Sequence, residues 1–287
     1  MKKLIRWARE YFRTAPKVPI LILVVLILAG LSADFIAPHD PEIGDPRLRL
    51  LPPFWIEGGM TTYPFGTDTM GRDILSRLIF GSRISLVVAF SAVVLAGFIG
   101  TVAGLIAGYF GGWVDQTIMR FTDAWLSIPT VNFGILMAVV AGPGVFNIIL
   151  IMSIVFWTRY ARVVRGETLS LKTRDFVNLA TIAGVSKYRI IARHILPNVM
   201  NSVITLASLQ IGVVIVVEAS LTFLGVGVPP PKPAWGLMLA EGRGGLLAGY
   251  WNLVLFPGFA IALLVLSFNL LGDWLRVHLD PHFRNLE

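Results

Sequence analysis

Several stretches of this chain are almost wholly apolar over the length that a helix needs to cross a membrane. About 20 predominantly apolar residues in an α-helix span a hydrocarbon core of about 30 Å. Charged residues make up 14% of the chain and the mean hydropathy is +0.75, whereas a soluble domain typically has about 25% charged residues. We therefore expect an all-α integral membrane protein that crosses the bilayer several times.

The apolar stretches predict six transmembrane helices in three regions. Residues 1–81 form an N-terminal region with one span, residues 82–277 a core with five spans, and residues 278–287 a short tail. The expected spans are 18–37, 85–108, 116–140, 145–165, 199–221 and 251–274. The Pro-rich stretch that follows the first span and the segment 222–250 are expected to be external loops.

The basic residues predict the orientation of the chain. Of the 24 Lys and Arg, 16 lie before the first span, between Arg159 at the inner end of the fourth span and Arg193, or from Arg276 onward. Because such loops stay on the cytoplasmic side, both termini are expected there. The net charge of +7 is thus explained without a nucleic-acid partner. A cleaved signal peptide is the alternative for the basic, aromatic-rich start, since a small Ser32–Ala33 pair follows the first apolar run.

Catalytic and metal chemistry finds little support in the residues. The chain has no cysteine, which excludes disulfides and Cys-ligated metals. Neither H-E-x-x-H nor G-x-S-x-G is present. The histidines are scattered at His39, His194, His278 and His282. An ion-coupled secondary transporter usually carries unpaired acids or broken helices at mid-membrane, whereas the charged residues of these spans lie near the span ends.

Small residues on the second span predict close helix packing. They recur three or four apart at Gly97, Gly100, Gly104 and Gly108. That spacing lets two helix backbones approach closely in lipid. We expect this face to need a helix partner, and hence the chain to need other subunits.

Charged residues near the inner ends of the third and fourth spans allow two interpretations. Arg120 and Asp123 lie three residues apart and are expected to form a structural ion pair, while Pro129 is expected to kink the same helix. Three arginines then recur at three-residue spacing: Arg159, Arg162 and Arg165. These could be snorkelling anchors at the membrane surface or could make specific contacts.

The stretch between the fourth and fifth spans mixes charged and apolar residues at helical spacing, which predicts two short helices. Thr173 or Asp175 can cap the first, and Gly184 can end it in a left-handed conformation. Ser186 can cap the second, and Pro197 is expected to stop it.

An apolar stripe on the second short helix gives this hairpin a face to bury. Tyr188, Ile191 and Ile195 form the stripe, and the basic side chains lie off it. The alternative to a docking element is an interfacial loop that rests on the bilayer.

The hairpin at 173–198 resembles the EAA loop of ABC importer permeases. Ala180 and Gly184 fit that pattern, as does the ending Ile195-Leu196-Pro197-Asn198, whereas Asn178 and Leu179 stand where the pattern has Glu and Ala. Three other stretches resemble the dipeptide/oligopeptide/nickel branch, namely FGTDTMGRDILSRLIFGSRISL, RFTDAWLSIP and EASLTFLGVGVPPPKPAWG. The long external segment after the first span resembles the C-type subunit of that branch.

The resemblance implies a type I ABC importer permease fold whose hairpin docks in a groove on a cytoplasmic ATPase. The implied coupling residues are Asp175, Ala180, Gly184, Ser186, Arg189, Arg193, His194 and Pro197. The implied partners are a related B-type permease, two ATPase subunits and an extracytoplasmic binding protein, in a bacterial or archaeal cell membrane. ATP and Mg²⁺ would be bound by the ATPase subunits, since G-x-x-x-x-G-K-[ST] is absent here. Small peptides are the first expectation for the substrate, with nickel chelates, glutathione or another small solute as alternatives.

Overall fold

The computed structural model describes residues 15–279, and these are helical apart from loops and one isolated bridge between Thr67 and Asp73. The basic start of the chain and nearly all of the expected tail lie outside this range. The elements are α2 (Lys17–Leu31), α3 (Ala33–Ile36), η1 (Pro46–Leu48), α4 (Ile74–Phe110), α5 (Gly112–Leu126), α6 (Thr130–Ala141), α7 (Val145–Lys172), α8 (Asp175–Ile182), α9 (Lys187–Ile190), η2 (Ile191–Ile195), α10 (Leu196–Phe223), α11 (Trp235–Leu246) and α12 (Asn252–Leu279).

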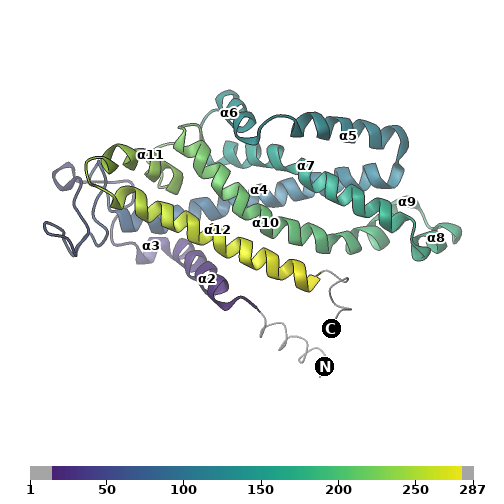
Figure 1. Cartoon of the computed structure of the whole chain (residues 1–287), viewed down its shortest axis with the longest axis horizontal. Coiled ribbons are helices and arrows are strands. Elements are labelled where there is room, and N and C mark those ends of the chain that lie inside the picture. The colour runs from purple at the N-terminus through teal and green to yellow at the C-terminus, as the bar shows by residue number, and fades with distance from the viewer. Residues whose placement is uncertain (1–14, 280–287) are drawn as a thin grey trace, which may run out of the picture.

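The long helices run side by side through an elongated bundle. Figure 1 shows α4, α7, α10 and α12 along its length, with α8 and α9 together at one end. The loops before α4 lie with α11 at the opposite end (Figure 1). The hairpin predicted to be cytoplasmic and the segments predicted to be external therefore lie at opposite ends.

Four single helices are long and apolar enough to cross a membrane: Ile74–Phe110, Val145–Lys172, Lys187–Phe223 and Asn252–His278. The first expected span, 18–37, is shorter than predicted. Its helix α2 has 15 residues, or about 22 Å at 1.5 Å per residue. It ends at Ser32, whose Oγ donates to the carbonyl of Leu28 at 2.6 Å, and α3 follows as a separate turn.

The expected third span is broken, not kinked. Its halves α5 and α6 meet at 92° and reach span length and hydropathy only when taken together, which would bring the candidate spans to five. The break falls between Leu126 and Thr130, where Pro129 takes extended backbone (ψ 127°) before α6. Proline supplies no N–H to continue the helix and disfavours helical backbone in the residue before it.

The contact between α4 and α7 is built on the glycine face. A Cβ on Gly104 would lie 2.6 Å from the carbonyl oxygen of Ala161, and one on Gly108 would lie 2.6 Å from Cβ of Thr168. Gly97 and Gly100 face Tyr160 in the same seam. The partner of this face is a helix of the same chain, so the expectation that the face requires another subunit was wrong.

The segment 222–250, predicted as a loop, contains the 12-residue helix α11. Its first residue, Trp235, is buried, and the indole Nε1 donates to the carbonyl of Leu78 on α4 at 3.0 Å. Gly81 permits this approach, since a Cβ there would lie 2.5 Å from the indole ring. The abundance of Gly and Pro around α11 hid the helix from the sequence pattern.

Candidate functional site

The hairpin between α7 and α10 is held in shape by its own backbone. Gly184 has φ +74°, the left-handed region that a residue without Cβ adopts readily. The Gly184 N–H donates to the carbonyl of Thr181 at 3.0 Å, and the Val185 N–H donates to that of Ala180 at 3.1 Å. This pair of bonds is the Schellman motif, which ends α8 and turns the chain toward α9.

The side-chain caps that the sequence predicted for the two hairpin helices do not form. The residue that precedes α8 is Arg174, and neither Thr173 nor Asp175 caps the helix with its side chain: Thr173 donates to the carbonyl of Ser170 at 2.9 Å, and Asp175 lies in the first turn. Ser186 does precede α9, but its hydroxyl makes no capping hydrogen bond.

Pro197 was predicted to stop the second helix, and this was wrong. The chain stays helical from Lys187 to Phe223. The π-helical segment η2 accommodates the proline, since the Leu196 N–H reaches back to the carbonyl of Ile191, five residues earlier. Pro197 then lies in the first turn of α10, where a missing N–H costs little.

The hairpin has an anchored side and an apolar exposed side. Val177, Ile190 and Ile195 are buried, and Ala180 packs against the same core. Leu179, Ile182 and Tyr188 are 65%, 82% and 80% exposed. Tyr188 therefore does not belong to the buried stripe that the sequence predicted.

Basic side chains accompany the exposed apolar ones. Arg189 and Arg193 are exposed, whereas His194 is half-buried with its ring 6.5 Å from that of Phe176. Large apolar side chains exposed at the end of a bundle are typical of a protein-interaction surface.

The three arginines on α7 make specific contacts. Arg159 donates to Oε1 of Gln210 on α10 at 2.9 Å, and Arg162 donates to Oδ1 of Asp123 on α5 at 2.7 Å. Arg165 binds both carboxylate oxygens of Asp115 on α5, with Nη2 2.6 Å from Oδ2. The helix that leads into the hairpin is thus tied to two neighbouring helices.

The expected Arg120–Asp123 pair was wrong. The carboxylate of Asp123 contacts Arg162 on α7, and no salt bridge of Arg120 occurs among residues 15–279. A contact between helices replaces the local one because the long Arg162 side chain reaches across the α5–α7 seam.

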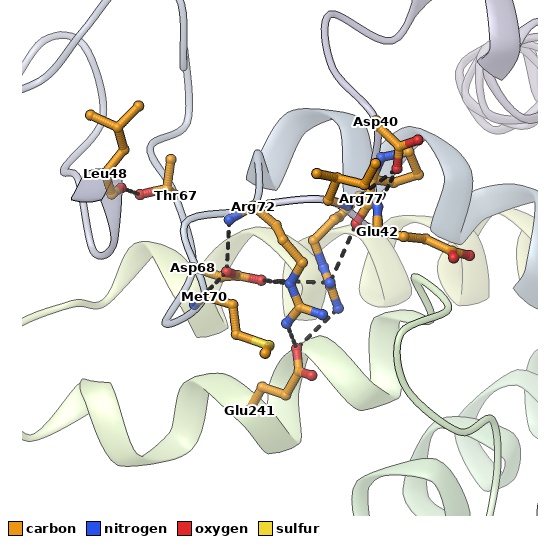
Figure 2. A network of polar contacts seen from close by, with 11 residues as sticks. Asp40, Glu42, Leu48, Thr67, Asp68, Met70, Arg72, Arg77 and Glu241 are labelled. Carbon is orange, nitrogen blue, oxygen red and sulfur yellow. Dashed lines mark hydrogen bonds and ion pairs between the residues drawn. The ribbon is translucent and has the colours of Figure 1, made fainter. Parts of the chain in front are cut away.

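At the opposite end, four charged side chains form a buried network that the sequence did not predict. This ionic cluster consists of Asp68, Arg72, Arg77 and Glu241, and Figure 2 shows the two arginines converging on Glu241. Arg72 Nη2 and Arg77 Nη2 lie 2.7 and 3.0 Å from Oε2 of Glu241. Arg72 Nε also donates to Asp68 at 2.6 Å. The cluster joins the segment before α4 and the start of α4 to α11.

Residues 100–285 match the family described as binding-protein-dependent transport system inner membrane component. The chain belongs to this family. The match includes the hairpin, α5 and α11. Within residues 15–279, no group of three or more His, Cys, Asp or Glu residues could hold a metal ion.

Curated relatives of this inner membrane component align over nearly the whole chain. The dipeptide transport system permease protein DppC of Haemophilus influenzae is 40% identical over 265 residues, 92% of this chain and 90% of that protein. The glutathione transport system permease protein GsiD of Pectobacterium atrosepticum is 37% identical over 280 residues, 98% and 90% of the two chains. The oligopeptide transport system permease protein OppC of H. influenzae is 38% identical over 277 residues, 96% and 88%.

Proposed function

We propose that this chain is the C-type permease subunit of an ATP-driven ABC importer of small peptides. The observation that carries the proposal is the hairpin at 173–198, a preformed apolar and basic projection joined directly to two long membrane helices. The similarity to permeases named for dipeptide and oligopeptide transport supports the substrate class. Glutathione, itself a tripeptide, is the second candidate because GsiD aligns with 98% of the chain.

The proposed assembly contains this chain, a related B-type permease, two cytoplasmic ATPase subunits and an extracytoplasmic binding protein. This chain is non-catalytic and forms half of the translocation pathway. ATP and Mg²⁺ are bound by the ATPase subunits. The chain has six spans, of which the short α2 is the first and the broken α5–α6 pair is the third, and the last five form the type I permease core. The chain lies in the bacterial or archaeal inner membrane with both termini cytoplasmic.

The mechanism follows from the connections of the hairpin. Closure of the ATPase dimer displaces α8 and α9. The displacement passes into α7 and α10 because α7 leads into the hairpin and α10 follows it. The two-point Arg165–Asp115 contact carries the movement of α7 to α5. Alternating access results when the two ends of the bundle open in turn.

The test is uptake by the assembled transporter in proteoliposomes. Labelled dialanine should enter when ATP and the binding protein are supplied, with labelled glutathione measured in parallel. Uptake of glutathione without uptake of dialanine would identify glutathione, the second candidate, as the substrate. Uptake driven by an ion gradient without ATP would instead identify a secondary transporter and overturn the proposal.

A further inference from the structure

One face of α5 is polar and exposed along its whole length. The exposed residues recur at intervals of three and four, so they form a single stripe on the helix. We call the following set, with Ser127 directly after the last residue of α5, the α5 stripe: Trp113, Gln116, Thr117, Arg120, Asp123, Ala124 and Ser127. Five of these seven residues are polar, one of them basic and one acidic. The exposed apolar side chains of Phe121 and Leu126 flank the stripe on its two sides.

The opposite face of α5 is fixed against α7 over the depth of the membrane. Asp115, in the first turn of α5, binds Arg165 near the inner end of α7. Trp125, in the last turn, donates through Nε1 to the carbonyl of Ile154 in the outer half of α7, at 2.8 Å. The helix therefore runs alongside a membrane-spanning helix and does not lie flat on the membrane surface. Its stripe extends from the inner end past the middle of α7.

Such a stripe is incompatible with lipid. A charged side chain at the centre of a spanning helix costs roughly 2.5–3.5 kcal/mol on the insertion scale, and in known membrane proteins such groups face the bundle interior or a water-filled cavity. Asp123 and Arg162 keep 60% and 56% of their side chains exposed while they contact each other at 2.7 Å. Water or a solute can therefore reach both charges.

We propose that the α5 stripe lines the solute path of the assembled transporter, and that Asp123 and Arg162 are the charges that a zwitterionic peptide meets there. The carboxylate suits the peptide's ammonium group and the guanidinium suits its carboxylate. The pair itself is exposed and weakly held, so a ligand with both charges can separate it without leaving either residue uncompensated. This inference rests on the proposed function and adds a site and a ligand chemistry to it.

The lack of cysteine makes the first experiment direct. Single cysteines are introduced by Ala124→Cys and Ser127→Cys on the stripe, and by Phe98→Cys on an exposed apolar part of α4 as the control. A charged methanethiosulfonate is applied to membranes that contain the complete transporter, and labelling is read on this chain. The two stripe cysteines should react several-fold faster than the control, and dialanine should slow them. Equal reactivity at all three positions would overturn the proposal.

The same labelling detects the competing occupant, the second permease. Stripe cysteines that react in this chain alone but are inert in the complete transporter would mean that a protein surface covers the stripe, which would also overturn the path.

The second experiment tests the charges. Asp123→Asn and Arg162→Gln are each combined with Ala124→Cys, and the dialanine concentration that halves the labelling rate is measured. It should rise about tenfold or more, the equivalent of a charge-assisted hydrogen bond of roughly 1.5 kcal/mol. The control is Asp34→Asn, which removes an Asp–Arg bridge of the same 2.7 Å length, with Arg83, near the opposite end of the molecule. Identical values for all three backgrounds would remove Asp123 and Arg162 from the site.

Uptake by the unmodified transporter separates the two proposals. ATP-driven uptake of dialanine together with an unreactive stripe would overturn this inference alone. Absence of ATP-driven uptake would overturn the proposed function and the α5 site with it.

Discussion

Replacing Glu241 by Gln should strongly destabilise the end of the bundle that carries α11. Two guanidiniums share Oε2 of this residue at 2.7 and 3.0 Å, and the side chains of Arg72 and Arg77 are 2% and 0% exposed. Gln keeps the shape of Glu but removes its charge. The cluster then holds two buried cations and one anion, Asp68.

The expected magnitude follows from the burial. Removing one partner of a buried ion pair typically costs about 3–5 kcal/mol, because the remaining charge is left uncompensated. The Glu241 side chain is 21% exposed, so water can screen part of the excess charge and we expect the lower end, about 3 kcal/mol. This corresponds to roughly a 150-fold increase in the unfolding equilibrium constant, at 1.36 kcal/mol per tenfold.

The assay is a titration of the purified protein in mixed micelles with SDS, followed by tryptophan fluorescence. Asp34→Asn is the control, since it breaks the exposed bridge to Arg83 and should change the transition little. A second variant, Arg77→Met combined with Glu241→Gln, leaves one arginine with Asp68 and should recover part of the loss. A Glu241→Gln transition that coincides with that of Asp34→Asn would refute the assignment of a stabilising role to the cluster.

Three further perturbations test the seam, the hairpin and the α5–α7 contact. Gly108→Leu should lower the free energy of unfolding by about 1–3 kcal/mol, since the new side chain overlaps α7; an unchanged SDS transition would contradict the close packing. Gly184→Val should reduce pull-down of the ATPase subunits, because a β-branched residue disfavours the φ of +74° at this position. The control Gly249→Val, at φ +91° and equally free of neighbouring atoms, should leave pull-down intact. Equal loss of pull-down in both variants would point to general unfolding. A double-mutant cycle on Asp123 and Arg162 should give a coupling energy of about 0–1 kcal/mol in the free chain, as both are exposed, and a coupling above about 3 kcal/mol would mean the pair is buried.

The sequence predicted best those features that depend on a few consecutive residues. Gly184 was expected to be left-handed, and it is, because a glycine that follows a short amphipathic helix is sufficient for a Schellman ending. The apolar stretches located the four long membrane helices for the same reason, since span length and hydropathy are local properties. Pro197 failed as a stop signal because a wide π turn can accommodate a proline.

Contacts between distant parts of the chain could not be predicted from the sequence. Arg77 and Glu241 are 164 residues apart, and nothing in their local patterns connects them. Asp123 had a nearby arginine at helical spacing, yet a partner on another helix replaced it. The exposed stripe on α5 was readable as periodicity, but only the packing of the opposite face on α7 shows that it lies at membrane depth.

The continuous helix from Lys187 to Phe223 gives the proposed transporter a long lever. Its 37 residues extend about 55 Å at 1.5 Å per residue, more than the thickness of the hydrocarbon core. A rigid rod of that length, rotated by about 5° about its hairpin end, displaces its far end by about 5 Å, roughly the pitch of one helical turn. In the proposed assembly, a small rotation of the ATPase surface against α9 is thereby amplified at the opposite end of the rod, where Phe223 leads into the loop that carries α11.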